Sequence, residues 1–264
     1  MMKQLLIALI LSTLLAALAF RRRALTGPGL ALAWVCALVI TYCGGVPAFL
    51  ALAATFVFTI AAGKLSRGVR ETVEKRIHAH RGPRNILQVF CNVFVGALML
   101  LLRRLTKNDA YLWAYAGAMA ASLSDSLASE LGVLSKAPPR DILSGKVMEK
   151  GLSGAVSPLG LCCSLLGALL IAAVCAPFWG GWAMLLSVTV AGFLAALADS
   201  VLGSCAQSKY RCTVCGTLME KPVCCFRPAQ LERGFAYMTN DAVNLLNNLV
   251  GALAALGAYA LFTA

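Results

Sequence analysis

Hydrophobic residues occur in long runs along this chain, and charged residues lie mainly between the runs. Runs of a length that suits a bilayer, at about 17–25 residues or slightly less, cover residues 4–20, 29–43, 46–62, 86–102, 110–127, 156–178, 182–202 and 241–263. Only Gly44 and Gly45 separate the second run from the third, which predicts a tight hairpin, with one kinked or re-entrant element as the alternative. The pattern predicts an all-α, polytopic transmembrane bundle of about 7–8 helices, with residues 1–264 in a single domain.

Basic residues are concentrated in alternate connections between these runs. The connections 21–23, 64–84, 136–150 and 209–233 hold 3, 7, 4 and 5 of the 23 Lys and Arg residues. The opposite side holds only Lys3, Arg103, Arg104 and Lys107. Because cytoplasmic loops carry the excess of Lys and Arg, we expect a multi-pass protein of the cell membrane whose N-terminus is outside and whose active face is cytoplasmic.

Composition supports a membrane protein. Hydrophobic residues make up 60% of the chain and charged residues 13%, which is about half the usual charged share. The formal charge of +12 is then explained by topology and by contact with anionic headgroups or phosphates, and nucleic acid is not expected as a partner. The sequence does not indicate an oligomeric state.

The first hydrophobic run could be a cleaved signal peptide. The basic residues 21–23 directly after it favour a retained helix.

The connection 64–84 is basic and has apolar residues at helical spacing, which predicts an interfacial helix. Its two histidines, His78 and His80, are expected to be surface residues.

Three aspartates stand at the predicted cytoplasmic ends of the runs. Asp125 and Asp199 lie 74 residues apart in similar Asp-Ser contexts, and Asp241 opens the last run. An ionised carboxylate inside a membrane helix costs at least about 2.5–3.5 kcal/mol, so it persists where a cavity, a partner or a cation compensates. Hard oxygen ligands of this kind suit Mg²⁺ held jointly with the phosphates of a nucleotide.

Other polar residues share helix faces or helix ends with these aspartates. Asp125 belongs to a polar stripe at i, i+3, i+4 and i+7 spacing, and Asp241 shares a face with two asparagines. The candidates for binding substrate or nucleotide in these runs are Ser126, Ser129, Glu130, Ser200, Asn240, Asn244 and Asn248. The alternative is that such groups only hydrogen-bond one helix to another within lipid.

The connection 135–157 interleaves glycine, serine and basic residues. Such a loop lets the backbone approach a phosphate while cations neutralise its charge. It is not a P-loop, because the chain contains no G-x-x-x-x-G-K-[ST] motif, and the positive-inside rule explains its lysines equally well. The candidates here are Arg140, Lys146, Lys150, Gly151, Gly154 and Ser157.

A group of cysteines lies in the predicted cytoplasmic loop 204–235. Cys212 and Cys215 are followed, after eight residues, by Cys224 and Cys225, which gives the number of ligands that a tetrahedral zinc site needs. Adjacent cysteines rarely ligate one ion comfortably, and Cys205 could replace one of them. Disulfides are not expected in the cytoplasm. Structural zinc and plain reduced thiols both stay open.

Five motifs together resemble a membrane family that contains plant phytyl-phosphate kinase and animal transmembrane protein 19, once catalogued as a domain of unknown function. These motifs are RNILQVFCN at 84–92, ASLSDSLASELG at 121–132, GLSGAVS at 151–157, ADSVLG at 198–203 and TNDAVN at 239–244. The usual Gly-Gly-Val-Ser of the family is Ser-Gly-Ala-Val-Ser here, and a histidine often found in the cysteine loop is absent.

The resemblance implies an enzyme that phosphorylates an isoprenyl monophosphate, such as phytyl phosphate, to the diphosphate with CTP or another nucleoside triphosphate. On this interpretation Asp125, Asp199 and Asp241 hold Mg²⁺, Lys146 acts with them in catalysis, and Asn92 joins the binding residues. Two alternatives stay open. A lipid cytidylyltransferase would release pyrophosphate, and a membrane transporter would have polar groups that continue to the outer side.

Overall fold

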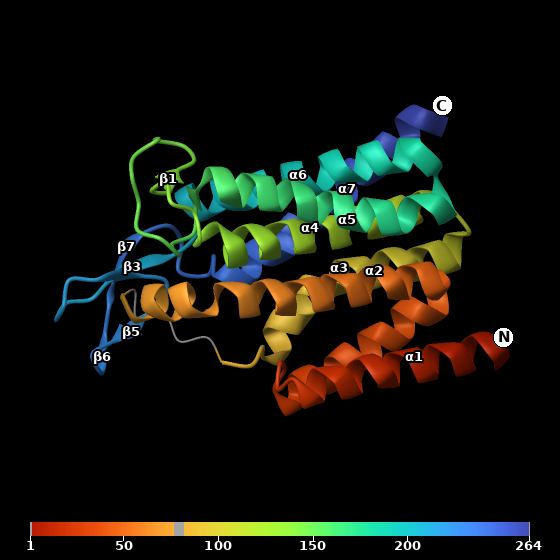
Figure 1. Cartoon of the computed structure of the whole chain (residues 1–264), viewed down its shortest axis with the longest axis horizontal. Coiled ribbons are helices and arrows are strands. Elements are labelled where there is room, and N and C mark those ends of the chain that lie inside the picture. The colour runs from red at the N-terminus through yellow and green to blue at the C-terminus, as the bar shows by residue number, and fades with distance from the viewer. Residues whose placement is uncertain (1, 77–81, 264) are drawn as a thin grey trace.

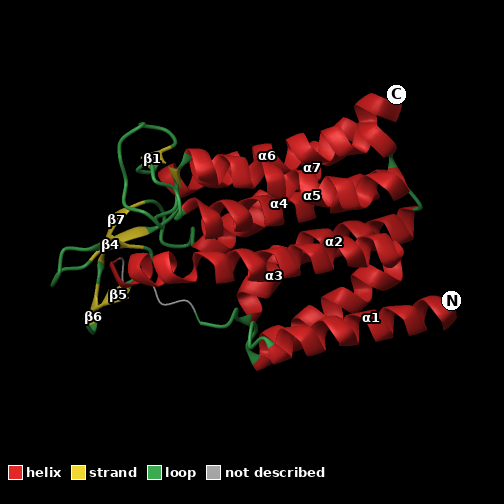
Figure 2. Ribbon diagram, viewed as in Figure 1, coloured by secondary structure: helices red, strands yellow, loops and turns green. Residues whose placement is uncertain are grey.

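The computed structural model describes residues 2–76 and 82–263, in which seven helices form a bundle with short strands at one end (Figures 1 and 2). The helices are α1 (Met2–Arg21), α2 (Gly27–Arg76), α3 (Ile86–Thr106), α4 (Ala110–Gly132), α5 (Pro158–Trp179), α6 (Gly181–Cys205) and α7 (Asn240–Thr263). The all-α transmembrane bundle predicted from the hydrophobic runs is confirmed.

Helix α2 is a hairpin of two helical arms. Its 50 residues would extend about 75 Å if straight, against a hydrocarbon core of about 30 Å. The helix breaks at Gly45, whose φ of 74° and ψ of −167° are not helical, and Pro47 follows. Glycine adopts a positive φ without the penalty that other residues pay. Figure 1 shows the second arm running back along the bundle, so the predicted hairpin at Gly44 and Gly45 is confirmed.

The two ends of the bundle differ. The strands and the connections 133–157 and 206–239 lie at one end, here called the loop end, while both termini of the chain lie at the other (Figure 1). The segment before α3 returns to the start of α2, where the Arg84 amide donates to the Ala24 carbonyl at 2.9 Å and the Thr26 amide donates to the Arg84 carbonyl at 3.0 Å.

Helix α4 lies in the middle of the bundle and contacts α2, α3, α5, α6 and α7. Its buried residues include Trp113, Tyr115 and Met119, and the Tyr115 hydroxyl donates to the Ala48 carbonyl of α2 at 2.6 Å. Among the seven described helices, α4 is the one not apolar enough to count as a candidate span on its own; the other six are. Since the other helices surround α4, protein and not lipid contacts its polar residues.

The outer helices expose apolar side chains. Leu165, Leu166 and Leu169 of α5 and Leu186 and Leu194 of α6 are each at least 42% exposed. Such a surface is costly in water but matches the hydrocarbon of a bilayer. This exposure agrees with the integral membrane character that the sequence predicts.

Seven short strands build the loop end. They are β1 (Arg140–Asp141), β2 (Ala155–Val156), β3 (Lys209–Arg211), β4 (Leu218–Met219), β5 (Val223–Cys224), β6 (Arg227–Pro228) and β7 (Gln230–Arg233), within the described residues. Strands β1 and β2 pair antiparallel, as do β5 and β6, and a three-stranded sheet has the order β4-β3-β7. Residues 206–239, which include β3 to β7, are called the cysteine lobe below.

The expected interfacial helix in the connection 64–84 is not a separate element. Residues 64–76 continue the second arm of α2 as one helix, with Leu65 and Val69 exposed and Val73 buried beside Leu152. The expectation about His78 and His80 concerns positions outside the described residues.

Candidate functional site

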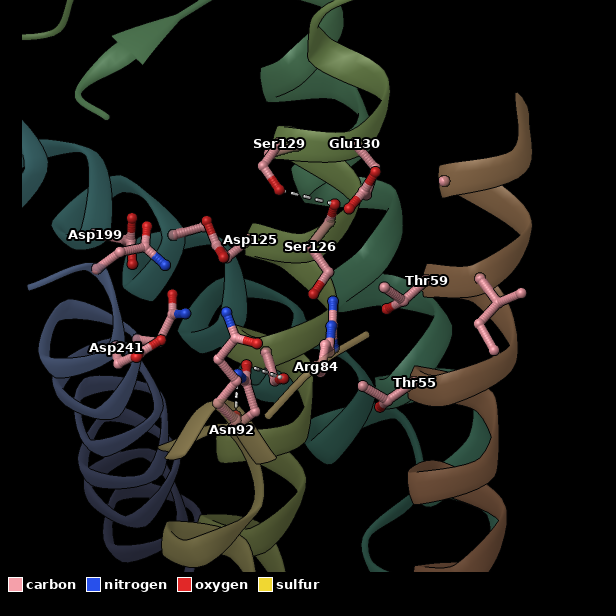
Figure 3. Close-up of a pocket in the computed structure, with 18 of the residues that line it drawn as sticks. Thr55, Thr59, Arg84, Asn92, Asp125, Ser126, Ser129, Glu130, Asp199 and Asp241 are labelled. Carbon is pink, nitrogen blue, oxygen red and sulfur yellow. Dashed lines mark hydrogen bonds between the residues drawn. The ribbon is translucent and has the colours of Figure 1, made fainter. Parts of the chain in front are cut away.

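Three carboxylates that are far apart in sequence lie around one cavity at the loop end. Asp125 of α4, Asp199 of α6 and Asp241 of α7 all line this cavity, whose volume is about 1070 Å³. Figure 3 shows the side chains of Asp125 and Asp199 pointing toward one another, with Asp241 beside them. The structure thus brings the three predicted acids together.

One of these carboxylates has an oxygen that protein groups do not satisfy. The Oδ2 atom of Asp199 is buried and has no hydrogen-bond partner within the described residues. The carboxylates of Asp125 and Glu220 lie close enough to act electrostatically on Asp199. Buried like charges repel one another, and a cation between them removes that repulsion. A cluster of carboxylate oxygens is also the donor chemistry that Mg²⁺ prefers, so the residues present fit this ion.

Glu220 is a cavity residue that sequence reasoning missed. It follows β4 in the cysteine lobe and lines the cavity together with Lys221. Its Oε1 atom accepts a hydrogen bond from the Ser153 backbone amide at 2.7 Å. The buried Lys209 donates to the Ser153 carbonyl at 2.8 Å, and burial, partly offset by the charge of Glu220, lowers the pKa of Lys209. The cysteine lobe is therefore bonded directly to the cavity wall.

Helices α3 and α4 supply neutral polar groups beside the acids. Asn92 donates to the Gln88 carbonyl at 2.8 Å and accepts from the Ser122 hydroxyl at 3.3 Å. Helix α3 begins with a capping box in which Asn85 and Gln88 bond reciprocally, which fixes where the helix starts. The capping box holds α3 so that Asn92 lies on the cavity wall (Figure 3).

Two arginines bring positive charge to the cavity. Arg84 precedes α3 and its side chain points into the cavity toward α4 (Figure 3). Arg70 of α2 forms an ion pair with Glu130 of α4, and both side chains are only 12% exposed. Glu130, predicted as a binding residue, therefore joins two helices through its charge while it lines the cavity.

The connection between α4 and α5 is held by Asp141, a residue not selected from the sequence. Its carboxylate accepts from the Ser204 hydroxyl at 2.6 Å and from the backbone amides of Ser144 at 2.7 Å and Leu143 at 3.1 Å. These hydrogen bonds, above all that from Ser204, lower the pKa of Asp141 to about 2. Aspartate commonly bonds the backbone two or three residues further on in a turn, and the D-x-x-S-G sequence here was the available signal.

Asp141→Asn is expected to make the protein less stable at neutral pH but not below about pH 2. A carboxyl group whose pKa falls from 3.8 to about 2 on folding stabilises the folded state by roughly 2 kcal/mol when both states are ionised. This contribution is present above pH 3.8 and is lost as the pH falls toward 2. Thermal unfolding of the two proteins in detergent from pH 7 to pH 2 should show their melting temperatures converge. A constant difference across this range would contradict the assignment.

Most predicted binding residues line the cavity, and three predicted residues do not. Arg140, the first residue of β1, and Lys146, in the β1–β2 connection, are both exposed, and Arg140 donates to the Gly145 carbonyl at 2.9 Å. Asn248 donates to the Cys91 carbonyl at 2.9 Å and so joins α7 to α3, as the alternative of helix-to-helix bonding predicts. The predicted binding residues that line the cavity are Ser126, Ser129, Glu130, Lys150, Gly151, Gly154, Ser157, Ser200, Asn240, Asn244 and Asn92.

Lys150 is partly committed to structure. Its Nζ atom donates to the Val133 and Ser135 carbonyls at 3.1 and 2.6 Å. These carbonyls follow the end of α4, where backbone acceptors lack partners within the helix. Ser157 caps the start of α5 by accepting from the Gly160 amide at 3.1 Å. The predicted phosphate loop is therefore ordered by its own residues.

The cavity also has an apolar part between the first three helices. Residues of α1, of both arms of α2 and of α3 form it, namely Leu15, Ala16, Ala19, Ala33, Trp34, Ala37, Leu52, Phe56 and Val93. Small alanines on α1 and α2 leave room there. This part, called the apolar arm below, joins the acidic end of the cavity in one continuous space.

The four cysteines selected from the sequence lie together in the cysteine lobe. The Sγ atoms of Cys212, Cys215, Cys224 and Cys225 all lie within 4.8 Å of one another. Cys205, considered as a replacement, ends α6 with an exposed side chain and is not part of this group among the described residues.

Comparisons with known proteins give a family but no solved fold. The family model described as integral membrane protein DUF92 matches residues 10–252. Protein PGR of Arabidopsis thaliana is 26% identical, covering 94% of this chain and 93% of the relative, and an uncharacterized membrane protein of Synechocystis is 27% identical, covering 95% and 89%. An uncharacterized membrane protein of Methanocaldococcus jannaschii is 35% identical over 121 residues, 45% of this chain and about half (51%) of that relative. No solved structure matches the chain.

Proposed function

The chain belongs to the DUF92 family of integral membrane proteins, and from its cavity we propose that it is a Mg²⁺-dependent lipid-phosphate kinase. The proposed reaction transfers a phosphoryl group from CTP or another nucleoside triphosphate to an isoprenyl monophosphate of the phytyl-phosphate type. The observation that carries this proposal is the single cavity that joins three aspartates to an apolar arm.

The shape of the cavity suits an amphiphilic acceptor. An isoprenyl chain would lie in the apolar arm, where Leu15, Trp34 and Phe56 remove it from water. Its phosphate would then lie at the loop end beside Asp125 and Asp199. A substrate with a charged head and a long apolar tail uses both parts, whereas a small polar metabolite uses only one.

The aspartates supply the ligands for the proposed metal ion. Asp125, Asp199 and Asp241 would hold Mg²⁺, and Glu220 lies close enough to Asp199 to influence the same charge. The bound ion would neutralise the charge on the phosphate oxygens of the donor. The three aspartates come from α4, α6 and α7, which pack against one another. This packing fixes where the positive charge of the ion would lie.

The proposed reaction needs few other groups. A phosphate monoester has a second pKa of about 6, so near neutral pH the acceptor oxygen is already largely ionised and no general base is required. Phosphoryl transfer then depends on alignment and on charge neutralisation. Arg84, Lys150 and Lys221 line the cavity and bring positive charge to the place where phosphates would meet.

The core beyond the cavity favours an enzyme over a transporter. Between the acids and the end of the bundle that holds the termini, the interior is packed with large buried side chains, including Trp113, Tyr115, Ile171 and Met184. A transport path would need polar groups that continue across the bundle. Within the described residues, this apolar core lies where such a path would run.

The test is turnover by purified protein in detergent with Mg²⁺, a nucleoside triphosphate, and a panel of prenyl alcohols and prenyl monophosphates of several chain lengths. We expect conversion of the monophosphates to diphosphates, with no reaction of the alcohols, because an alcohol would require a base to remove its proton. Phosphorylation of the alcohols alone would contradict the proposed acceptor. Asp109→Asn, which changes an aspartate at the far end of α4 that pairs with Arg103, serves as the matched control and should keep full activity.

A further inference from the structure

The spacing of the four thiols in the cysteine lobe is that of ligands around one ion. Cys215 and Cys224 have Sγ atoms 3.8 Å apart, and those of Cys224 and Cys225 are 3.7 Å apart. Four sulfurs placed tetrahedrally at about 2.3 Å from a zinc ion are separated by about 3.8 Å. Within the described residues, no disulfide joins any of the four cysteines, so their sulfurs are available as thiolate ligands.

The first pair of cysteines lies on a turn that presents sulfur to an ion. The Cys212 Sγ atom accepts from the backbone amides of Val214 and Cys215, each at 3.4 Å. The Gly216 amide donates to the Cys212 carbonyl at 3.0 Å, and Gly216 has a φ of 71°, which glycine adopts readily. Backbone amides that donate to a sulfur fix the direction in which its side chain points, as outer partners of a metal ligand do.

Cys224 and Cys225 are adjacent in the chain, but a turn lets both of their sulfurs face the first pair of cysteines. In a regular strand, successive side chains point to opposite faces. Cys224 ends β5, but Cys225 and Phe226 have φ values of 49° and 58° at the turn to β6. This left-handed turn ends the alternation, and both sulfurs therefore face the first pair.

The cysteine lobe has little else to hold it together. Its buried cluster consists of Cys212, Met219 and Cys224 with Tyr210 packed against it, and its strands are two to four residues long. Units this small rarely bury enough apolar surface to be stable and usually need disulfides or a metal. Two of the three cluster residues are themselves members of the thiol group.

We propose that Cys212, Cys215, Cys224 and Cys225 bind one structural zinc ion. Four thiolates select zinc or iron over harder ions, and four protein ligands leave no open position for catalysis at the metal. The positive-inside rule places the lobe in the cytoplasm, where thiols stay reduced. This site is separate from the carboxylate cavity and does not depend on the proposed kinase activity.

Binding of the proposed zinc ion would also stabilise one wall of the carboxylate cavity. Glu220 lies in the chain between the two pairs of ligands and accepts the Ser153 amide hydrogen bond. The zinc ion would close the loop that presents Glu220, so its removal should loosen the cavity wall at residues 151–157.

The test is the metal content of the purified full-length protein, measured by mass spectrometry of the elements. We expect about one zinc per chain in the unaltered protein, loss of that zinc in Cys215→Ser and in Cys224→Ser, and retention in Cys205→Ser, the matched control with a nearby thiol outside the group. A zinc-free protein, stoichiometric iron, or zinc retained by Cys215→Ser would each overturn the proposal.

A second measurement keeps the proposal testable if the serine variants do not fold. In the unaltered protein, alkylation mapped by peptide mass spectrometry should spare these four cysteines until a chelator is added, and should modify Cys205 from the start. The same chelator should raise amide hydrogen exchange at residues 151–157. Cysteines that are released only by a reductant would be disulfides and would contradict the zinc site. Neither readout uses turnover, so failure of the kinase proposal would leave it unaffected.

Discussion

Asp199→Asn is expected to lower prenyl diphosphate formation by at least about 10²–10³-fold without lowering the melting temperature. An amide cannot supply the negative charge that holds Mg²⁺, so the transferred phosphoryl group loses its main charge neutralisation. The fold should tolerate the change, because the Asp199 Oδ2 atom is buried without a hydrogen-bond partner within the described residues. Replacing this carboxylate with an amide also removes its repulsion by the carboxylates of Asp125 and Glu220.

The measurement compares initial rates and thermal unfolding of Asp199→Asn and Asp109→Asn in the same detergent. Asp109 lies at the other end of the bundle, where its side chain is 62% exposed, and the same chemical change there should leave the rate unaltered. Full activity in Asp199→Asn would remove the proposed metal site. A loss of activity accompanied by unfolding would show that Asp199 stabilises the bundle instead.

Gly154→Ala is expected to lower the stability of the protein by about 2–4 kcal/mol and to reduce turnover with it. Gly154 has a φ of +85°, and a Cβ atom there would lie 2.6 Å from the Ser204 amide nitrogen and 2.7 Å from its Cα atom. Backbone atoms cannot move aside as a flexible side chain can. The loop would be pushed away from α6, which would weaken the hydrogen bond between Ser204 and Asp141.

Gly145→Ala is the matched control for this change. Gly145 lies in the same connection with a φ of +66°, but a methyl group added there would have no neighbouring atom within 4 Å. Gly145→Ala should therefore lower the stability by the conformational cost of about 1 kcal/mol, with no steric collision. Melting temperatures of both variants separate the two causes. Equal losses of stability would show that the close approach of Gly154 to α6 contributes nothing.

Much of the fold follows from hydrophobic periodicity alone. The eight hydrophobic runs coincide with helices, apart from the first two residues of the run 156–178, because a bilayer tolerates a spanning segment only if its backbone is internally bonded. The hairpin is predicted from the sequence because only Gly44 and Gly45 separate two hydrophobic runs, and the structure breaks the helix at Gly45. The interfacial helix predicted in the connection 64–84 is not a separate element among the described residues, because residues 64–76 continue α2, and both alternatives have the same helical spacing of apolar residues.

The three aspartates of the site can be predicted from their position in hydrophobic runs. Asp125, Asp199 and Asp241 stand out because an acid in an apolar run needs compensation, and the ends of adjacent helices lie at one depth. Glu220 could not be found in this way. It lies in a polar segment where acids are common, and only the pairing of β3 with β4 and β7 brings it back to Ser153.

The loop between α4 and α5 shows the same limit. Its composition indicated a phosphate-binding loop, and Gly151, Gly154 and Ser157 do line the cavity. Composition cannot tell which basic residues turn inward, and Lys146 remains exposed in the β1–β2 connection. The hydrogen bond between Ser204 and Asp141, which lie 63 residues apart, joins this loop to α6, and the sequence gives no signal for it.

The most direct test of the proposed activity follows the α- and γ-phosphates of the nucleotide separately. Purified protein would be incubated with Mg²⁺, prenyl monophosphate and a nucleoside triphosphate labelled either at the γ- or at the α-phosphate. A lipid-phosphate kinase places the γ-label in the prenyl diphosphate, releases the α-label as nucleoside diphosphate, and loses both products in Asp199→Asn. Transfer of the α-label to the lipid with release of pyrophosphate, or no transfer of either label, would contradict it.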